Sequence, residues 1–125
     1  MSATILHVED NASNRKIVRD LLGSRGYRVV EALDGEEALA AAERERPDLI
    51  LMDVQLPRVS GLEATRRIKA RPDLSHIPIV AVTSFALSGD DKAALAAGCN
   101  AYVAKPYQPR ELLRIIEELL RGAHG

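Results

Sequence analysis

Asp53 is the first residue whose position suggests chemistry, because it ends an apolar run and precedes a loop that contains proline and glycine. The run comprises Leu49–Met52, and the loop continues to Gly61. This pattern predicts a buried strand with a carboxylate at its carboxyl edge, which is where ligands bind in an open parallel sheet. A lone aspartate can also simply open a turn. Other polar groups at the same edge therefore decide between the two interpretations.

Three more apolar runs end in polar side chains that suit such a site. They are Ala3–Val8, closed by Glu9 and Asp10; Pro78–Val82, closed by Thr83; and Ala101–Ala104, closed by Lys105 and Pro106. At about 5 Å and an effective dielectric of about 20, two carboxylates repel by about 3 kcal/mol, so three of them favour a bound cation. A site of few carboxylates suits Mg²⁺ better than Ca²⁺. An ammonium and a hydroxyl nearby would stabilise the oxygens of a transferring phosphoryl group.

The elements that must position these side chains alternate along the chain. We expect another strand over Tyr27–Ala32 and helices around Ile17–Leu22 and over Glu36–Arg46, Leu62–Arg71, Asp90–Gly98 and Glu111–Arg121. Alternating strands and helices imply right-handed crossovers and a parallel sheet covered on both faces. The strands are nearly continuous apolar runs, which agrees with burial on both sides.

The fold class is therefore α/β, a doubly wound (βα)5 arrangement with a five-stranded parallel sheet. The flavodoxin-like strand order 2-1-3-4-5 is common at this size and makes the first and third strands neighbours. That order would place Glu9 and Asp10 beside Asp53, with Thr83 and Lys105 at the ends of the next two strands. The sequence thus predicts one acidic site with an alcohol and an amine opposite the metal.

Length and composition narrow the classes of protein. With 125 residues and 46% hydrophobic content, we expect one domain over residues 1–125, with its core at about 3–121 and no output domain. Seventeen basic and eighteen acidic side chains with 3% aromatics argue against nucleic-acid binding. Cys99 cannot form an internal disulfide, and no signal peptide or membrane-spanning run is evident, so we expect a cytoplasmic protein without membrane contact.

Four segments together resemble the receiver domain of response regulators from bacterial two-component systems, over essentially the whole chain. They are Val8–Asn11, Asp48–Gly61, Ile79–Thr83 and Tyr102–Pro106. Each segment alone is a weak signal, but their order and spacing are highly specific. The chain looks most like stand-alone receivers of the DivK type, which have no output domain.

The resemblance implies that Asp53 accepts a phosphoryl group from a phosphohistidine of a histidine kinase or phosphotransfer protein. By similarity, Asp10, Asp53 and the backbone carbonyl of Gln55 bind Mg²⁺, and Glu9 acts through metal-bound water. The protein would catalyse its own phosphorylation and slow hydrolysis without being an enzyme toward other substrates. It would serve as a switch, a relay intermediate or a phosphate sink in a phosphorelay.

The resemblance also implies a conformational response in the fourth and fifth strands of the sheet. Lys105 would contact the acyl phosphate, its bond to Pro106 would be cis, and Thr83 would donate its hydroxyl to a phosphoryl oxygen. Tyr102 would then turn from an exposed to a buried rotamer and reshape the surface of helix 4, strand 5 and helix 5. Phosphorylation can bias such a switch only through contacts made in one state.

One position departs from the commonest family pattern, and two others lie where the family sets the rate of hydrolysis. Glu9 replaces the aspartate often found there, which lengthens the reach to the metal. Phe85 and Gln55 lie where family members tune loss of the phosphoryl group, and we hypothesise that the bulk of Phe85 slows hydrolysis. Simple packing of Phe85 under its loop is the alternative. His7, in a buried strand, is expected to be a hydrogen-bonded core histidine rather than a metal ligand.

Partner surfaces are the last expectation from the sequence. At 100° per residue, the apolar side chains of the last helix span about 160°, against about 100° for packing on a sheet alone. The surplus favours a partner, such as a homodimer through helix 4, strand 5 and helix 5, or deeper core packing. The downstream target is a protein that the sequence leaves unnamed.

Two other function classes fit the residues less well. A phosphatase of the haloacid dehalogenase type also uses a nucleophilic aspartate on a parallel sheet, but it carries a second aspartate two residues on, where this chain has Gln55. A degenerate receiver that binds partners without phosphorylation would be expected to lack Asp10, Asp53, Thr83 or Lys105, and all four are present.

Overall fold

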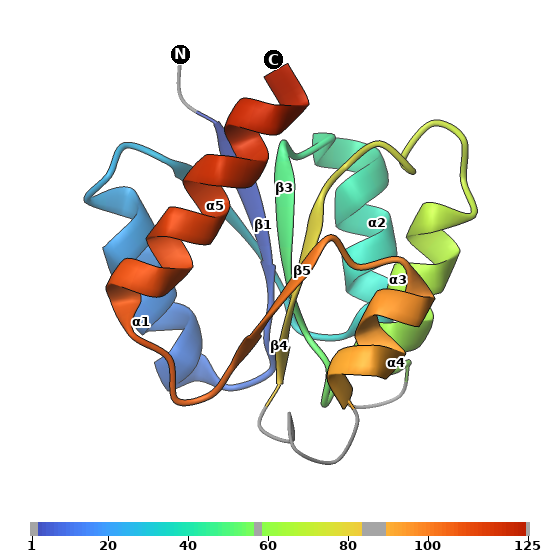
Figure 1. Cartoon of the computed structure of the whole chain (residues 1–125), viewed down its shortest axis with the longest axis horizontal. Coiled ribbons are helices and arrows are strands. Elements are labelled where there is room, and N and C mark those ends of the chain that lie inside the picture. The colour runs from blue at the N-terminus through green and yellow to red at the C-terminus, as the bar shows by residue number, and fades with distance from the viewer. Residues whose placement is uncertain (1–2, 57–58, 84–89, 125) are drawn as a thin grey trace.

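The computed structural model describes residues 3–56, 59–83 and 90–124, and these contain an alternation of strands and helices. The elements are β1 (Thr4–Val8), α1 (Ala12–Gly23), β2 (Arg28–Ala32), α2 (Gly35–Glu45), β3 (Leu49–Asp53), α3 (Gly61–Lys69), β4 (Ile79–Thr83), α4 (Asp90–Ala97), β5 (Ala101–Ala104) and α5 (Pro109–His124). The strands form one parallel sheet in the order β2-β1-β3-β4-β5, which confirms the predicted α/β fold (Figure 1). None of the helices in the described ranges has the length and apolar character needed to span a bilayer.

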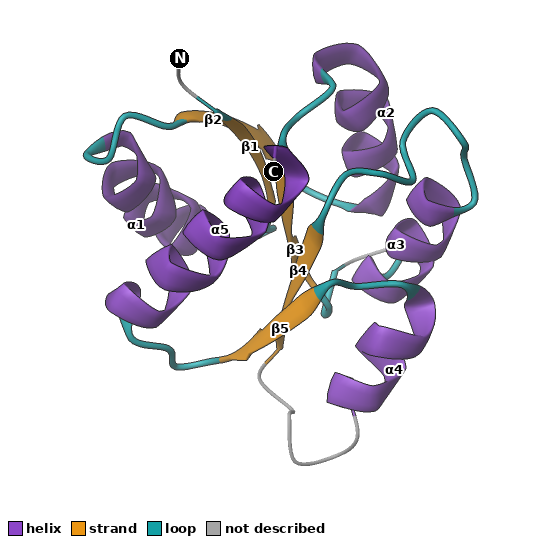
Figure 2. Ribbon diagram, turned by 45° about the horizontal axis from the view of Figure 1, so that its top comes forward, coloured by secondary structure: helices purple, strands orange, loops and turns teal. Residues whose placement is uncertain are grey.

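Helices cover both faces of the sheet. Figures 1 and 2 show α1 and α5 on one face and α2, α3 and α4 on the other. Because side chains alternate along a strand, the inner strands contribute to both cores; in β3, for example, Leu49 and Leu51 face the α1 and α5 side, and Ile50 and Met52 face the other. The site at the carboxyl edge therefore rests on strands that are fixed from two sides.

Three helices begin at the carboxyl edge of the sheet with a side-chain cap. The caps are Asn11, Asp34 and Ser60, and each accepts a hydrogen bond from the backbone N–H three residues further on. Such caps satisfy N–H groups that a helix end leaves without an intrahelical partner. They therefore fix the starts of these three helices at the carboxyl edge of the sheet.

The last helix is longer than the predicted Glu111–Arg121, because it begins at Pro109. Proline suits the first helical position, since its missing N–H would have no intrahelical partner there. The backbone carbonyl of Gln108 accepts hydrogen bonds from Glu111 and Leu112 at 3.0 and 3.2 Å. Ile115 and Leu119, on the flank of the wide apolar face, are half-buried and pack against the core under α1 and α5. Core packing therefore accounts for these two side chains.

Candidate functional site

Strand register brings the predicted site residues to one edge. In the pairing of β1 with β3, Val8 lies opposite Met52, so Glu9 and Asp53 are the next residues of two adjacent strands. In the pairing of β4 with β5, Thr83 lies opposite Ala104, which places Lys105 one residue beyond. The strand order 2-1-3-4-5 thus converts four distant chain segments into neighbours.

Three carboxylates converge at the junction of β1 and β3. Glu9, Asp10 and Asp53 each offer a carboxylate oxygen, and these oxygens lie within 4.8 Å of one another. Glu9 and Asp53 are buried, with only 2% and 5% of their surface exposed, whereas Asp10 is exposed. An oxygen-rich cluster of this kind, open to solvent on one side, is compatible with a hard divalent cation that keeps several water ligands.

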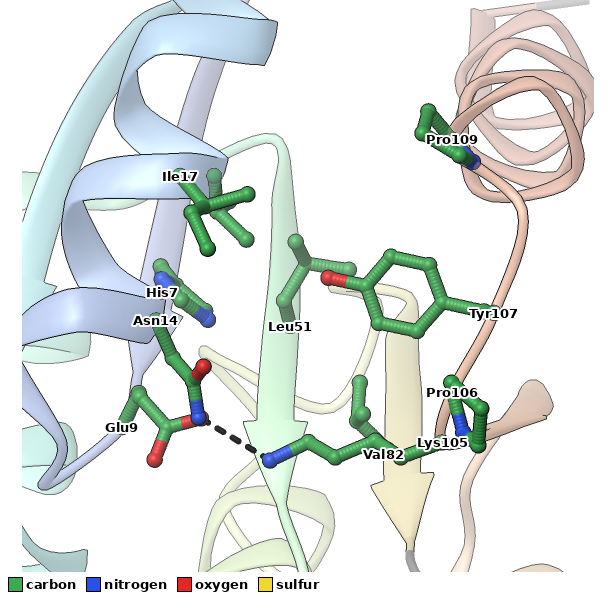
Figure 3. Close-up of a pocket in the computed structure, with 11 residues that line it drawn as sticks. His7, Glu9, Asn14, Ile17, Leu51, Val82, Lys105, Pro106, Tyr107 and Pro109 are labelled. Atoms are coloured by element: carbon green, nitrogen blue, oxygen red, sulfur yellow. Dashed lines mark hydrogen bonds and ion pairs between the residues drawn. The ribbon is translucent and has the colours of Figure 1, made fainter.

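Lys105 reaches this cluster from the end of β5. Its Nζ lies 3.0 Å from Glu9 Oε1 and 3.4 Å from Asp53 Oδ2. Figure 3 shows the lysine side chain extended across the sheet edge toward Glu9. The ammonium therefore provides one positive charge between two buried carboxylates, which the like-charged pair requires in a region of low dielectric.

Burial and charge shift the two buried acids in opposite directions. Burial and the negative charge of Glu9 raise the pKa of Asp53 to about 6, although the Gln55 backbone N–H and Lys105 act against the shift. Burial also acts to raise the pKa of Glu9, but hydrogen bonds from Lys105, from Asp53 in its protonated form and from the Asn11 backbone hold it below its ordinary value. Near neutral pH Asp53 is therefore mostly a carboxylate that sits close to its own protonation equilibrium.

The loop after β3 holds Asp53 tightly. The backbone N–H of Gln55 donates to Asp53 Oδ1 at 2.9 Å, which directs the other oxygen, Oδ2, toward Lys105. Gly61 packs directly against the Asp53 main-chain carbonyl, and its N–H donates to the carbonyl of Val54 at 3.2 Å. The chain closes over the back of the acid and leaves its carboxylate facing the cluster.

The other predicted residues lie around this centre. Thr83 is buried at the end of β4, and its carbonyl accepts a hydrogen bond from the Lys105 N–H at 2.7 Å. The Lys105–Pro106 peptide bond is cis. Tyr102 lies on β5 with 38% of its surface exposed. Phe85 lies outside the described residues, so its proposed effect on hydrolysis stays a prediction.

Comparison with known proteins places this geometry in a family. The sequence profile of the response regulator receiver domain matches residues 5–117, which include Glu9, Asp53 and Lys105. The chain belongs to the response regulator receiver domain family. The receiver is 45% identical over 123 residues to the polar-differentiation response regulator DivK of Brucella anthropi, covering 98% of this chain and 100% of that one.

Solved structures of related receivers share the fold. The receiver domain of the sensor histidine kinase PA1611 from Pseudomonas aeruginosa superimposes with a TM-score of 0.90 at 44% identity, over 96% of this chain and 98% of that one. That structure holds a magnesium ion in its active-site cleft. The chemotaxis response regulator CheY4 of Vibrio cholerae matches with a TM-score of 0.89 at 31% identity, over 95% and 99% of the two chains.

The receiver also contains contacts that the sequence analysis missed. Asn14 Nδ2 donates to Glu9 Oε1 at 3.3 Å, and the Asn11 N–H donates to Glu9 Oε2 at 3.2 Å. Arg15 holds the main-chain carbonyl of Glu9 at 2.9 Å. The sequence signal that could have predicted the Asn14 contact is Asn11 as a helix cap. A polar side chain three residues after a cap points back toward the preceding segment, which here contains Glu9.

His7 matches its prediction in burial and differs from it at one ring nitrogen. The imidazole is 5% exposed, as expected of a core histidine, but its Nδ1 has no hydrogen-bond partner among the described residues, so the expected hydrogen bonding does not extend to that nitrogen. Burial lowers the pKa of His7 to about 4, and the ring is neutral at physiological pH. His7 lines a mainly apolar pocket of about 540 Å³ between α1 and the segment after β5, shown in Figure 3.

Proposed function

We propose that this receiver is a phosphoacceptor in two-component signalling, with Asp53 as the residue that is phosphorylated. The observation that carries the proposal is the position of the Lys105 ammonium, between the buried carboxylates of Glu9 and Asp53. A cation in that position can stabilise the negative oxygens of a phosphoryl group on Asp53. Asp53 is the acid best suited to attack, since its other oxygen is already fixed by the Gln55 N–H.

Asp10 and Asp53 would bind Mg²⁺ together with the backbone carbonyl of Gln55, and Glu9 would act through a water ligand. The observed cluster supports this choice, because it consists of three carboxylates with an exposed acid, Asp10, on the open side. When bound, magnesium supplies positive charge that neutralises the phosphoryl oxygens during transfer.

In the transfer itself, an Asp53 carboxylate oxygen attacks the phosphorus of a phosphohistidine on a histidine kinase or phosphotransfer protein. A P–O bond forms as the P–N bond breaks, and the imidazole nitrogen leaves with the electron pair. Lys105 turns from Glu9 toward the new phosphoryl oxygens. Hydrolysis later returns Asp53 to a carboxylate and releases inorganic phosphate, so the chain catalyses its own phosphorylation and dephosphorylation and acts on no other substrate.

The output would be a change in the surface of the receiver itself. The phosphoryl group carries a charge of about −1.5 to −2, which would attract Lys105 and the Thr83 hydroxyl and draw the end of β4 inward. Tyr102, now exposed on β5, would turn inward and alter the α4, β5 and α5 surface. A downstream protein or a second copy of the chain would read that surface.

Phosphotransfer profiling tests the proposal. The protein is incubated with each purified histidine kinase of its host, ATP and Mg²⁺, and its intact mass is measured. We expect one added phosphoryl group on the parent, none on Asp53→Asn, and an unchanged result on Asp73→Asn, an exposed aspartate in the segment between α3 and β4. Full labelling of Asp53→Asn would reject Asp53 as the acceptor.

A further inference from the structure

Glu9 is held by more donors than a single ion pair provides. Its Oε1 accepts hydrogen bonds from Lys105 Nζ at 3.0 Å and from Asn14 Nδ2 at 3.3 Å. Its Oε2 accepts one from the Asn11 N–H at 3.2 Å. A charged and a neutral donor thus share one buried oxygen, and only the charged donor also contacts Asp53.

Asn14 is itself fixed in place. It lies in the first turn of α1, where its backbone N–H donates to the cap Asn11 Oδ1 at 2.9 Å. Its side chain is half-buried and lies with those of Glu9 and Lys105 along one pocket wall (Figure 3). The adjacent Arg15 holds the Glu9 carbonyl at 2.9 Å. The first helical turn therefore positions both the main chain and the side chain of Glu9.

This arrangement bears on the movement of Lys105. If Lys105 turns to the phosphoryl group, as the proposed function requires, Glu9 Oε1 loses its charged donor while it remains buried. A buried carboxylate oxygen without a donor is costly. Asn14 is already within hydrogen-bond distance of that oxygen, so it can satisfy the oxygen when the ammonium leaves.

We propose that Asn14 is a positioning residue that keeps the Glu9 carboxylate in place while Lys105 transfers to the phosphoryl group. The inference rests on the proposed function and adds a role for a residue outside the predicted site. Of the two side chains that donate to Glu9 Oε1, Asn14 and Lys105, only Lys105 is left when the amide is removed. The lysine is then held at Glu9 and is less available to the phosphoryl group. Loss of Asn14 should therefore weaken the phosphorylated state more than it weakens the resting metal site.

Two affinities measured by calorimetry separate these states: that for Mg²⁺ alone, and that for beryllofluoride, a phosphoryl mimic, in saturating Mg²⁺. In Asn14→Leu, which keeps the shape and removes the donor, we expect the beryllofluoride affinity to fall about tenfold, roughly the effect of one hydrogen bond to a charged group. The Mg²⁺ affinity should change by less than about twofold, because Lys105 still holds Glu9. Asn14→Gln, which restores an amide donor, should recover part of the loss, and Ser13→Leu, on the exposed side of the same turn, should match the parent.

An equal fall in both affinities, or no fall in either, overturns the role of Asn14. A parent that binds neither Mg²⁺ nor beryllofluoride instead contradicts the proposed function. A measurement on the parent covers the case in which Asn14→Leu does not fold. The side-chain NH2 resonances of Asn14 should shift downfield when beryllofluoride is added to the magnesium-loaded protein, since the bond to Glu9 shortens; unchanged resonances overturn the inference.

Discussion

Gly61 lies so close to the main-chain carbonyl of Asp53 that a Cβ atom at position 61 would overlap that oxygen. The contact joins the first residue of α3 to the last residue of β3. It brings the first residue of α3 back against the end of β3, with the Gly61 N–H bonded to the Val54 carbonyl. The position of Asp53 therefore depends on a residue without a side chain, eight positions further along the sequence.

Gly61→Ala is expected to destabilise the protein, because the added methyl group must displace the backbone of β3 or α3. Overpacking of this kind costs about 1–3 kcal/mol in free energy of unfolding. Urea denaturation measures the change, and phosphotransfer to Asp53 should slow in parallel. Gly23→Ala is the matched control: nothing lies within 4 Å of its new methyl group, and replacing a helical glycine stabilises by about 0.5–1 kcal/mol. Equal stability of Gly61→Ala and Gly23→Ala would show that position 61 does not lie close to the Asp53 carbonyl.

Asp53→Asn is expected to raise the stability of the metal-free protein at neutral pH. Since burial and Glu9 raise the pKa of Asp53 to about 6, the folded state binds this proton more tightly than the unfolded state does. The resulting stability is present below the ordinary pKa and is lost as the pH rises through about 6. The asparagine is neutral throughout, so the Tm difference between variant and parent should be about 4 °C or more at pH 7.5 and below about 2 °C at pH 4.5.

Asp73→Asn is expected to lower the stability at neutral pH, which is the opposite direction to Asp53→Asn, and it serves as the control for the measurements at different pH. A hydrogen bond from Arg71 holds the pKa of Asp73 below its ordinary value. Its contribution to stability is therefore present above the ordinary pKa and is lost on acidification. A parent and Asp53→Asn that melt together at every pH would contradict the repulsion between Asp53 and Glu9.

Magnesium is expected to stabilise the parent against thermal unfolding, and a chelator should reverse the effect. At a concentration ten times the Kd, binding to the folded state alone contributes about 1.4 kcal/mol. Asp10→Asn should lose most of this stabilisation, because it removes the exposed carboxylate of the cluster. Differential scanning calorimetry with matched ionic strength makes the comparison, and an undiminished shift in Asp10→Asn would exclude that residue as a ligand.

Phe85→Ala is expected to lose its phosphoryl group faster than the parent. The reason comes from the sequence alone: a bulky apolar side chain two residues beyond Thr83 would obstruct the attacking water. The decay of the labelled protein, followed by intact mass after the kinase is removed, measures the rate. A variant that decays at the parental rate would favour the alternative that Phe85 simply packs under its loop.

The sequence by itself determined the fold and the identity of the polar groups at the sheet edge. Apolar runs that end in Glu9, Asp53, Thr83 and Lys105 alternate with helical segments, and the handedness of parallel crossovers leaves few ways to connect them. Strand ends then meet at one edge whatever the details of side-chain packing. This is why the strand order and the convergence of the acids could be predicted from local patterns.

Only the tertiary structure decided how these groups are held. The donors to Glu9 come from α1 and from Lys105, 96 residues away, and their choice depends on rotamers and helix position rather than on periodicity. The raised pKa of Asp53 and the close approach of Gly61 likewise arise from burial among distant segments, as does the His7 Nδ1, which has no hydrogen-bond partner in the described part of the chain. Distances of a few ångströms set these properties, and hydrophobic pattern does not encode distances at that scale.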